Sequence, residues 1–366
     1  PIVMSQHDKK TLYHGANLVL KSTDGGLSWS EISPDLTRND TTKQGLGGGP
    51  ITNEGAGGEN YNTLAYLVES PHKAGVLWSG SDDGLVYLTQ DDGKSWQNVT
   101  PPDAQEGIIN AIEVSPHDPA TAYVTLIRYK LNDFAPYVYK TTDFGQSWTS
   151  INTGFEGEDF VRVVREDPKK KDLLYAGTEG GMYVSYDGGQ QWAPFQLNLP
   201  VTPINDMTFR DNDLVIATSG RGFWILDDVG ALQQSNGVLA DADMKLFAPK
   251  PTVKLNASVP DEPVPGMGQN PMNGVIIDYY LAEEVADSLT LSLEILDASG
   301  AVIRSYDNQK DESFKPYPGG PAPKKVLPTE KGINRFAWDF RRNTIPHVPD
   351  VFVMGDYRGH LKWRNG

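Results

Sequence analysis

Short runs in which hydrophobic and polar residues alternate occupy the first two-thirds of the chain. Residues 161–165 read Val-Arg-Val-Val-Arg and residues 182–186 read Met-Tyr-Val-Ser-Tyr, with Asp-Pro and Gly-Gly turns between the runs. Such runs predict short strands, because successive side chains of a strand face opposite sides of a sheet. Stretches of Ala, Leu, Glu and Lys that favour long helices are few. We therefore expect an almost all-β chain.

An eight-residue segment, which we call the repeat motif, recurs four times in phase with these runs. Residues 22–29, 89–96, 141–148 and 185–192 follow the form S/T-x-D-x-G-x-S/T-W, with Gln191 as the departure. Their aspartates are spaced by 67, 52 and 44 residues and are Asp24, Asp91, Asp143 and Asp187. A four-stranded propeller blade takes about 40 to 50 residues. The spacing predicts a multi-bladed β-propeller in residues 1–228.

About five blades are visible in this part of the sequence. The fifth, over residues 204–228, is degenerate and lacks the glycine and tryptophan of the repeat motif. The chain opens inside the first blade, because residues 2–4 already supply its first strand. We expect a longer precursor whose upstream sequence supplies further blades and an export signal.

The repeat motif has a structural interpretation. An aspartate in a turn accepts hydrogen bonds from nearby N–H groups, and glycine adopts the positive φ that other residues resist. The tryptophan adds an apolar face that packs against the neighbouring blade. Because the motif recurs in four blades whereas an active site occurs once, we predict that the four aspartates hold turns. Structural calcium on them is an open alternative to no cofactor, although no D-x-D-x-D-G loop with a distal glutamate is present.

The character of the sequence changes after residue 228. Residues 229–274 contain Pro- and Gly-rich stretches and are predicted to form a linker. Alternation returns at 276–281 and 289–296, and residues 297–300 predict a hairpin turn. We therefore expect a β-sandwich in residues 275–366. Its pattern resembles the immunoglobulin-like modules that follow many bacterial secreted propellers.

Composition narrows the classes of partner and chemistry. The chain has 48 acidic and 32 basic residues and a net charge of -16, which disfavours binding to nucleic acid or to anionic membranes. It has no cysteine, so a disulfide framework, a thiolate metal site and a cysteine nucleophile are excluded. No apolar run approaches the about 20 residues that span a bilayer. His7, His72 and His117 recur at one turn position, and we interpret them as turn residues rather than metal ligands.

Together, the repeats and the second domain resemble the bacterial sortilin-like, Asp-box (BNR) repeat propellers that are often labelled glycosyl hydrolases. Besides the four repeat motifs, the resemblance is carried by segments 33–40, 49–54, 218–228 and 332–339, and it covers nearly the whole chain. It implies an exported protein that is periplasmic, associated with the outer membrane, or extracellular. It does not imply a substrate.

The repeat frame also predicts where a site would lie. The repeat motifs share one rim of the propeller, which leaves the loops of the opposite rim for ligand binding. Two places on that rim lengthen the repeat, residues 45–61 and 126–136. The candidate catalytic carboxylates there are Glu54, Glu59, Asp82 and Glu179, and the candidate ligand-binding residues are Asn60, Tyr61, Asp83, Arg128, Tyr129, Arg162 and Arg221.

Two functions remain open from the sequence. The favoured one is a non-catalytic binding or assembly module for a protein, peptide or polysaccharide partner at the cell envelope. The alternative is a secreted glycoside hydrolase in which two rim carboxylates serve as acid and as base or nucleophile. Hydrolysis requires those carboxylates to be about 5 to 10 Å apart in a groove.

Overall fold

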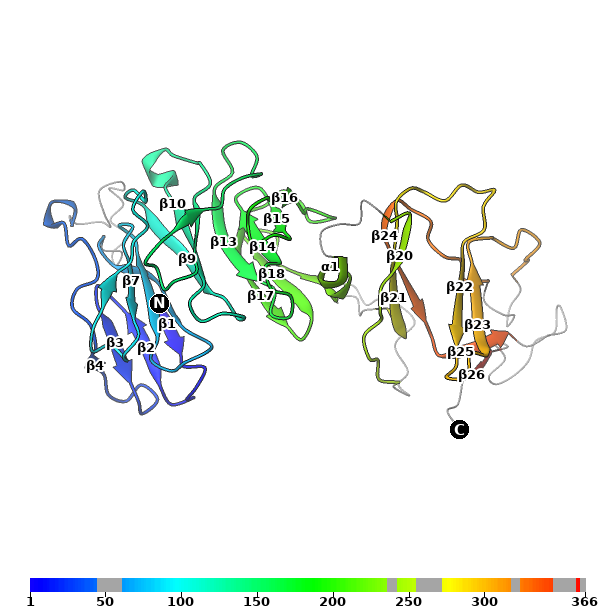
Figure 1. The fold of residues 1–366 in the computed structure, drawn as a ribbon, viewed down its shortest axis with the longest axis horizontal. Coiled ribbons are helices and arrows are strands. Elements are labelled where there is room, and N and C mark those ends of the chain that lie inside the picture. Colours follow the sequence, from blue (N-terminus) through cyan, green and yellow to red (C-terminus); the bar gives the residue numbers. More distant parts are fainter. Residues whose placement is uncertain (45–60, 236–241, 255–271, 317–322, 345–359, 363–366) are drawn as a thin grey trace. The chain divides into compact units, whose positions relative to one another are not determined.

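The computed structural model describes residues 1–44, 61–235, 242–254, 272–316, 323–344 and 360–362 (Figure 1). The chain divides into two compact units, Pro1–Asp227 and Asp228–Gly366. Each unit has its own hydrophobic core. Among the helices in the described ranges, none has the length and apolar character of a membrane span.

The first unit is a series of five antiparallel sheets, which we call blades 1 to 5, and each follows the order of the chain. Blades 1 to 4 have four strands and blade 5 has three. The strands are β1 (Ile2–Met4), β2 (Leu12–Gly15), β3 (Val19–Ser22) and β4 (Ser30–Glu31); β5 (Leu64–Glu69), β6 (Leu77–Ser81), β7 (Val86–Thr89) and β8 (Gln97–Asn98); β9 (Ile108–Val114), β10 (Ala122–Ile127), β11 (Val138–Thr141) and β12 (Thr149–Ser150); β13 (Val161–Glu166), β14 (Leu174–Thr178), β15 (Met182–Ser185) and β16 (Ala193–Pro194); and β17 (Ile204–Arg210), β18 (Asp213–Thr218) and β19 (Phe223–Leu226). Figure 1 shows the blades following one another from blue to green. The predicted all-β, multi-bladed fold is confirmed.

The first strands of blades 2 to 5 lie next to one another, in the order β5, β9, β13 and β17. Each carries a shift in its pairing register with the second strand at the corresponding position. The residues skipped by the pairing are Ala65, Asn110, Arg162 and Asn205. A β-bulge re-aims a side chain and increases the local twist of a strand. Because the bulge recurs in blades 2 to 5, it orients one side chain of each first strand in the same way.

The hydrophobic core of the first unit lies between successive blades. One cluster joins blades 1 and 2 around Tyr13 and Leu67, and a second joins blades 2 and 3 around Trp78 and Ile112. A third joins blades 3 and 4 around Trp192. Because each blade buries its face only against its neighbours, a blade has no core of its own.

The tryptophans of the repeat motifs fasten each blade to the one before it. The indole Nε1 atoms of Trp96, Trp148 and Trp192 donate to backbone carbonyl oxygens of the preceding blade at 2.8, 2.7 and 2.8 Å. The acceptors are Ile32, Val99 and Ile151, each of which directly follows a fourth strand. Trp29 of blade 1 has no preceding blade in the described chain, and its Nε1 donates to Gly26 in its own turn.

Histidines of the first turn in each blade connect to the following blade. The Nε2 atoms of His7, His72 and His117 lie 2.9, 2.8 and 2.7 Å from the carbonyl oxygens of Ser70, Ser115 and Asp167, respectively. Each acceptor occupies the corresponding turn one blade further along. The predicted turn residues therefore also link consecutive blades.

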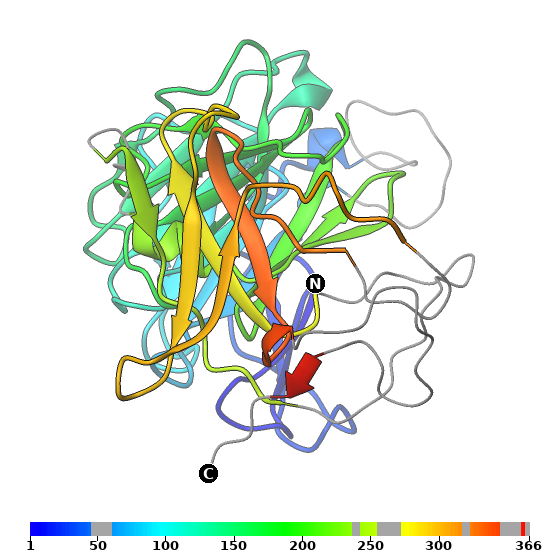
Figure 2. The same ribbon diagram turned by 90° about the vertical axis from the view of Figure 1, so that its right-hand side faces the viewer.

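The second unit contains separate antiparallel sheets, drawn from yellow-green to red in Figures 1 and 2. One sheet has the order β20 (Met244–Leu246), β21 (Val275–Leu281) and β24 (Gly332–Trp338). Two hairpin-like pairs are β22 (Ser292–Leu296) with β23 (Val302–Asp307), and β25 (Arg341–Thr344) with β26 (His360–Lys362). The part of the sequence predicted to be a linker contains helix α1 (Gly230–Ser235) and strand β20. The pairing of β20 with β21 explains this difference, since a short strand gains its stability from tertiary pairing that sequence does not show.

Candidate functional site

The repeat motifs lie in equivalent turns between the third and fourth strands of blades 1 to 4. In blade 2, Oδ1 of Asp91 accepts from the Ser95 N–H at 2.9 Å and the Thr89 hydroxyl at 2.9 Å. Its Oδ2 accepts from the Ser95 hydroxyl at 2.7 Å. The hydrogen bonds from Ser95 and Thr89 lower the pKa of Asp91 to about 2. Both oxygens of this carboxylate therefore accept hydrogen bonds from within its own turn.

The other three motifs follow the same arrangement. Hydrogen bonds from Ser28 and Ser147 lower the pKa values of Asp24 and Asp143 in the same way. Asp187 accepts a hydrogen bond from the Gln191 N–H at 3.0 Å. Gln191 replaces the serine of the other motifs, so the hydroxyl that this serine supplies is missing here. The glycine of the motif is required by space as well as by φ, since a Cβ on Gly93 would lie 2.6 Å from the carbonyl oxygen of Ile32.

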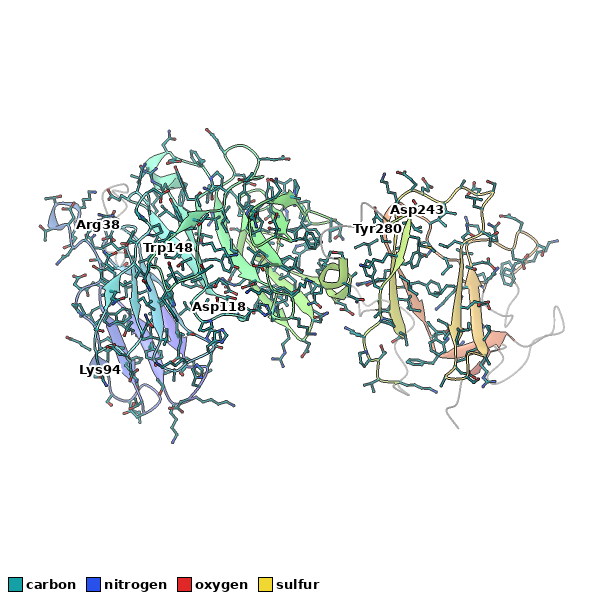
Figure 3. All side chains as sticks on the ribbon, in the orientation of Figure 1. Arg38, Lys94, Asp118, Trp148, Asp243 and Tyr280 are labelled. Atoms are coloured by element: carbon teal, nitrogen blue, oxygen red, sulfur yellow. The ribbon has the colours of Figure 1, made fainter. Side chains whose placement is uncertain are left out.

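The rim opposite the repeat motifs is formed by the turns between second and third strands and by the links between blades. In Figure 3, Arg38 of one such link lies above Lys94 of a repeat motif and above Asp118 of a first turn. The predicted residues Glu54, Glu59 and Asn60 lie outside the described residues.

Asp82 and Asp83 follow β6 and fasten the link that enters blade 2. Oδ1 of Asp82 accepts from the N–H groups of Asn62 and Thr63 at 3.0 and 2.9 Å. Burial raises the pKa of Asp82, against these hydrogen bonds. Asp83 is buried, and its Oδ2 accepts from the Arg38 N–H at 2.7 Å. Both carboxylates therefore hold backbone rather than face a groove.

The lengthened turn between β10 and β11 is held by Arg128. Its guanidinium pairs with Asp133 and donates from Nε to the carbonyl oxygen of Glu106 at 2.8 Å. Tyr137 donates its hydroxyl hydrogen to Asp133 Oδ2 at 2.9 Å. Asp133 therefore joins the two ends of the turn.

Tyr61 belongs to a second group on this rim. Its hydroxyl and the Lys43 ammonium both donate to Glu106 Oε1, with the Lys43 Nζ at 2.6 Å. The hydrogen bonds from Lys43 and Tyr61 lower the pKa of Glu106. Glu106 was not among the predicted residues, because a single glutamate in a link carries no pattern.

An aromatic platform of Tyr129, Phe134 and Phe160 lies where the lengthened turn meets blade 4. Tyr129 stacks on Phe160 with ring centroids 5.5 Å apart and an interplanar angle of 13°. Phe134 lies 6.3 Å from the same ring. Tyr129 is 38% exposed, whereas Phe160 is buried. The platform therefore presents one supported aromatic face to solvent.

Arg162 and Glu179 lie beside the aromatic platform. We call these two residues and the platform together the rim cluster. The Arg162 guanidinium lies 5.1 Å from the Phe160 ring centroid, and its Nη2 is 2.6 Å from Glu179 Oε2. Arg162 occupies the bulge of β13, which explains its orientation. Arg221 does not join the cluster; it lies in blade 5, and its Nη1 donates to Gly220.

A second polar network, absent from the sequence prediction, lies between the first strands. The Arg165 Nη2 atom donates to the Tyr66 hydroxyl at 3.1 Å and to Asp206 Oδ1 at 2.7 Å, and Nε donates to the Met207 carbonyl oxygen at 3.0 Å. Its Nη1 lies 3.4 Å from Glu113 Oε2. Burial raises the pKa of the Glu113 carboxyl to about 7, which the positive charge of Arg165 opposes. One arginine thus joins blades 2, 3 and 5 to blade 4.

Comparisons with known proteins gave one similar curated sequence and several structures with a similar fold. No family model matches the chain. A curated relative, a probable oligoxyloglucan-reducing end-specific xyloglucanase of Neosartorya fischeri, is 27% identical over 164 residues, which are 43% of this chain and 17% of that protein. The chain therefore spans less than one-fifth of the length of that relative.

Solved structures with a similar fold include two kinds of protein. The GH74 xyloglucanase from Xanthomonas campestris aligns with a TM-score of 0.46 and 18% identity, over 61% of this chain and 36% of that one. YCF48 from Cyanidioschyzon merolae aligns with a TM-score of 0.43 and 13% identity, over 59% of this chain and 65% of that one. These likenesses concern the fold alone.

Proposed function

We propose that this chain is an exported binding module whose rim cluster engages a protein, peptide or glycan partner at the cell envelope. The proposal rests on one contrast: two candidate carboxylates of this rim are bonded to other protein groups, whereas an aromatic ring is exposed. Asp82 holds backbone N–H groups and Glu179 pairs with Arg162, so neither carboxylate is left as a free acid or base. Tyr129, in contrast, offers an exposed ring that is already held in place by Phe160.

A rigid aromatic ring binds at low conformational cost. Its face takes up apolar C–H surface, which both sugar rings and peptide side chains present. Arg162 beside it supplies N–H donors whose orientation Glu179 fixes. A few fixed polar groups around an apolar contact give a binding site its specificity. The rim cluster has this composition.

Glycoside hydrolysis remains the second candidate, and the xyloglucanase relative favours it. That mechanism needs one carboxyl that keeps its proton near neutral pH and a second that is ionised, on either side of a sugar. Asp82 has a raised pKa, but its oxygens are occupied by Asn62 and Thr63. The geometry of the described residues therefore favours binding over turnover.

The proposal is tested by single substitutions in the rim cluster. We expect Tyr129→Ala and Arg162→Ala to weaken binding of soluble xyloglucan, or of envelope proteins retained on the immobilised chain, by about tenfold or more each. Arg221→Ala, a change of the same type outside the cluster, is the matched control and should leave binding unchanged. The assays are affinity electrophoresis in xyloglucan and quantitative pull-down, with circular dichroism to verify folding.

Release of reducing ends from xyloglucan is measured on the same proteins. No release is expected from the wild-type chain. The hydrolase would be the better proposal if the wild type released reducing ends and Glu179→Gln or Asp82→Asn, with folding intact, lowered that turnover by several orders of magnitude. Equal binding by wild type, Tyr129→Ala and Arg162→Ala would remove the rim cluster as the site.

A further inference from the structure

Among the described residues, blade 5 has no counterpart of the fourth strand that completes the other blades. In blades 1 to 4 a two-residue fourth strand pairs with the third strand, as Ala193 and Pro194 pair with Val184 and Tyr183 in blade 4. The sheet of blade 5 ends at β19, which has a partner on its β18 side only. The edge of β19 is open in the described chain, with Phe223 80% exposed and Ile225 59% exposed.

The register of blade 5 identifies the backbone that a fourth strand would meet. Met182 pairs with Gly177 of β14, and Phe223 pairs with Ala217 of β18 in the same way. Trp224 and Ile225 therefore stand where Tyr183 and Val184 stand in blade 4. An exposed strand edge with unpaired N–H and C=O groups is a template for an added strand.

A groove lies beside this edge, between blades 4 and 5. Its walls come from the first unit alone and include Met182, Phe195, Leu199, Ile216, Trp224 and Ile225. At the other blade boundaries, a repeat-motif tryptophan packs there and donates to the residue that follows the preceding fourth strand. Phe195 is the corresponding residue of blade 4, since it directly follows β16. In the repeat, therefore, an indole ring occupies the position that corresponds to this groove.

We propose that the edge of β19 and this groove bind an extended segment of a partner polypeptide that carries a tryptophan directly before its pairing residues. The segment adds a fourth strand to blade 5 through its backbone. Its indole enters the groove and donates to the Phe195 carbonyl oxygen. In blades 1 to 4 the chain forms the fourth strand directly after the repeat motif, whereas the described chain after β19 forms helix α1 and then β20, which pairs with β21 of the second unit. We therefore assign the added strand to a separate polypeptide.

The probe is a synthetic peptide, Gly-Lys-Ser-Trp-Gln-Asn-Val-Thr, that copies residues 93–100 and so contains a tryptophan and the fourth strand of blade 2. We expect the full chain to bind the labelled peptide by fluorescence anisotropy, and the same peptide with alanine in place of tryptophan to bind at least about tenfold more weakly. Ile225→Lys should weaken binding of the tryptophan peptide to a similar degree. Leu27→Lys, the same type of change at an exposed residue of blade 1, is the matched control and should bind it normally.

Hydrogen exchange separates this proposal from other occupants of the edge. The β19 amides that face the open edge, and not β18, should exchange rapidly in the free chain and slowly with the peptide bound. Equal affinity for the two peptides, or full binding by Ile225→Lys, would overturn the proposal. So would protection of these edge-facing amides without peptide, because the chain would then cover its own edge. A free chain that dimerises, and is made monomeric by Ile225→Lys, would assign the edge to a second copy.

Discussion

Replacing Trp192 with alanine is expected to lower the free energy of unfolding by about 3 to 5 kcal/mol. The Trp192 side chain is 1% exposed and packs on Phe155 with ring centroids 5.0 Å apart. Its Nε1 donates to the Ile151 carbonyl oxygen across the boundary between blades 3 and 4. Alanine would leave a cavity and an unpaired carbonyl oxygen at that boundary. Urea denaturation followed by circular dichroism measures the loss.

The chain provides a matched control in blade 1. Trp29 occupies the same position of the motif but is 41% exposed, and it bonds only within its own turn. Trp29→Ala should therefore cost less than about 1 kcal/mol in the same experiment. If the two substitutions cost the same, the tryptophans stabilise their own turns and do not join blades.

Arg165→Met is expected to destabilise the fold by about 3 to 5 kcal/mol. Removing the guanidinium leaves the Glu113 carboxyl partly buried without its positive partner and the Met207 carbonyl oxygen without its donor. The double variant Arg165→Met with Glu113→Gln should recover part of the loss, because no uncompensated buried charge remains. A double variant no more stable than Arg165→Met alone would show that the pair is not coupled.

The same pair predicts how stability depends on pH. Burial raises the pKa of Glu113 from 4.5 to about 7, so the folded chain holds this proton more tightly than the unfolded chain. The contribution of Glu113 to stability is therefore complete below about pH 4.5 and is lost as pH rises toward about 7. Glu113→Gln should remove this fall in the free energy of unfolding with rising pH. In Arg165→Met the fall should continue to higher pH, because the positive charge that lowers the pKa of Glu113 is gone. Denaturation curves collected between these pH values measure both effects.

Features that repeat in the sequence could be predicted well, because their causes are local. The aspartates of the repeat motif bind N–H groups within four residues, so spacing alone identifies the turns. The lengthened turn after β10 could also be found, since it interrupts the repeat. Tyr129, Arg162 and Glu179 are predicted from their place on the rim opposite the repeat motifs, and the structure brings them together around Phe160.

Contacts between distant blades could not be predicted in the same way. Arg165 and Tyr66 are separated by 99 residues, and nothing in the periodicity of either strand indicates that they meet. Phe160 was missed because an aromatic residue before a strand has the pattern of a core residue. Asp83 was assigned to ligand binding because it is polar and lies in a rim turn, but burial and its bond to Arg38 give it a structural place.

Measuring thermal unfolding and xyloglucan or partner binding side by side for Asp143→Ala and Tyr129→Ala tests the account most directly. Asp143 receives both the N–H and the hydroxyl of Ser147, whereas Tyr129 presents its ring to solvent. We expect Asp143→Ala to lower the unfolding temperature and to leave binding by the folded protein intact. Tyr129→Ala should weaken binding and leave the unfolding temperature unchanged. Full stability with lost binding in Asp143→Ala, together with unchanged binding in Tyr129→Ala, would contradict the account.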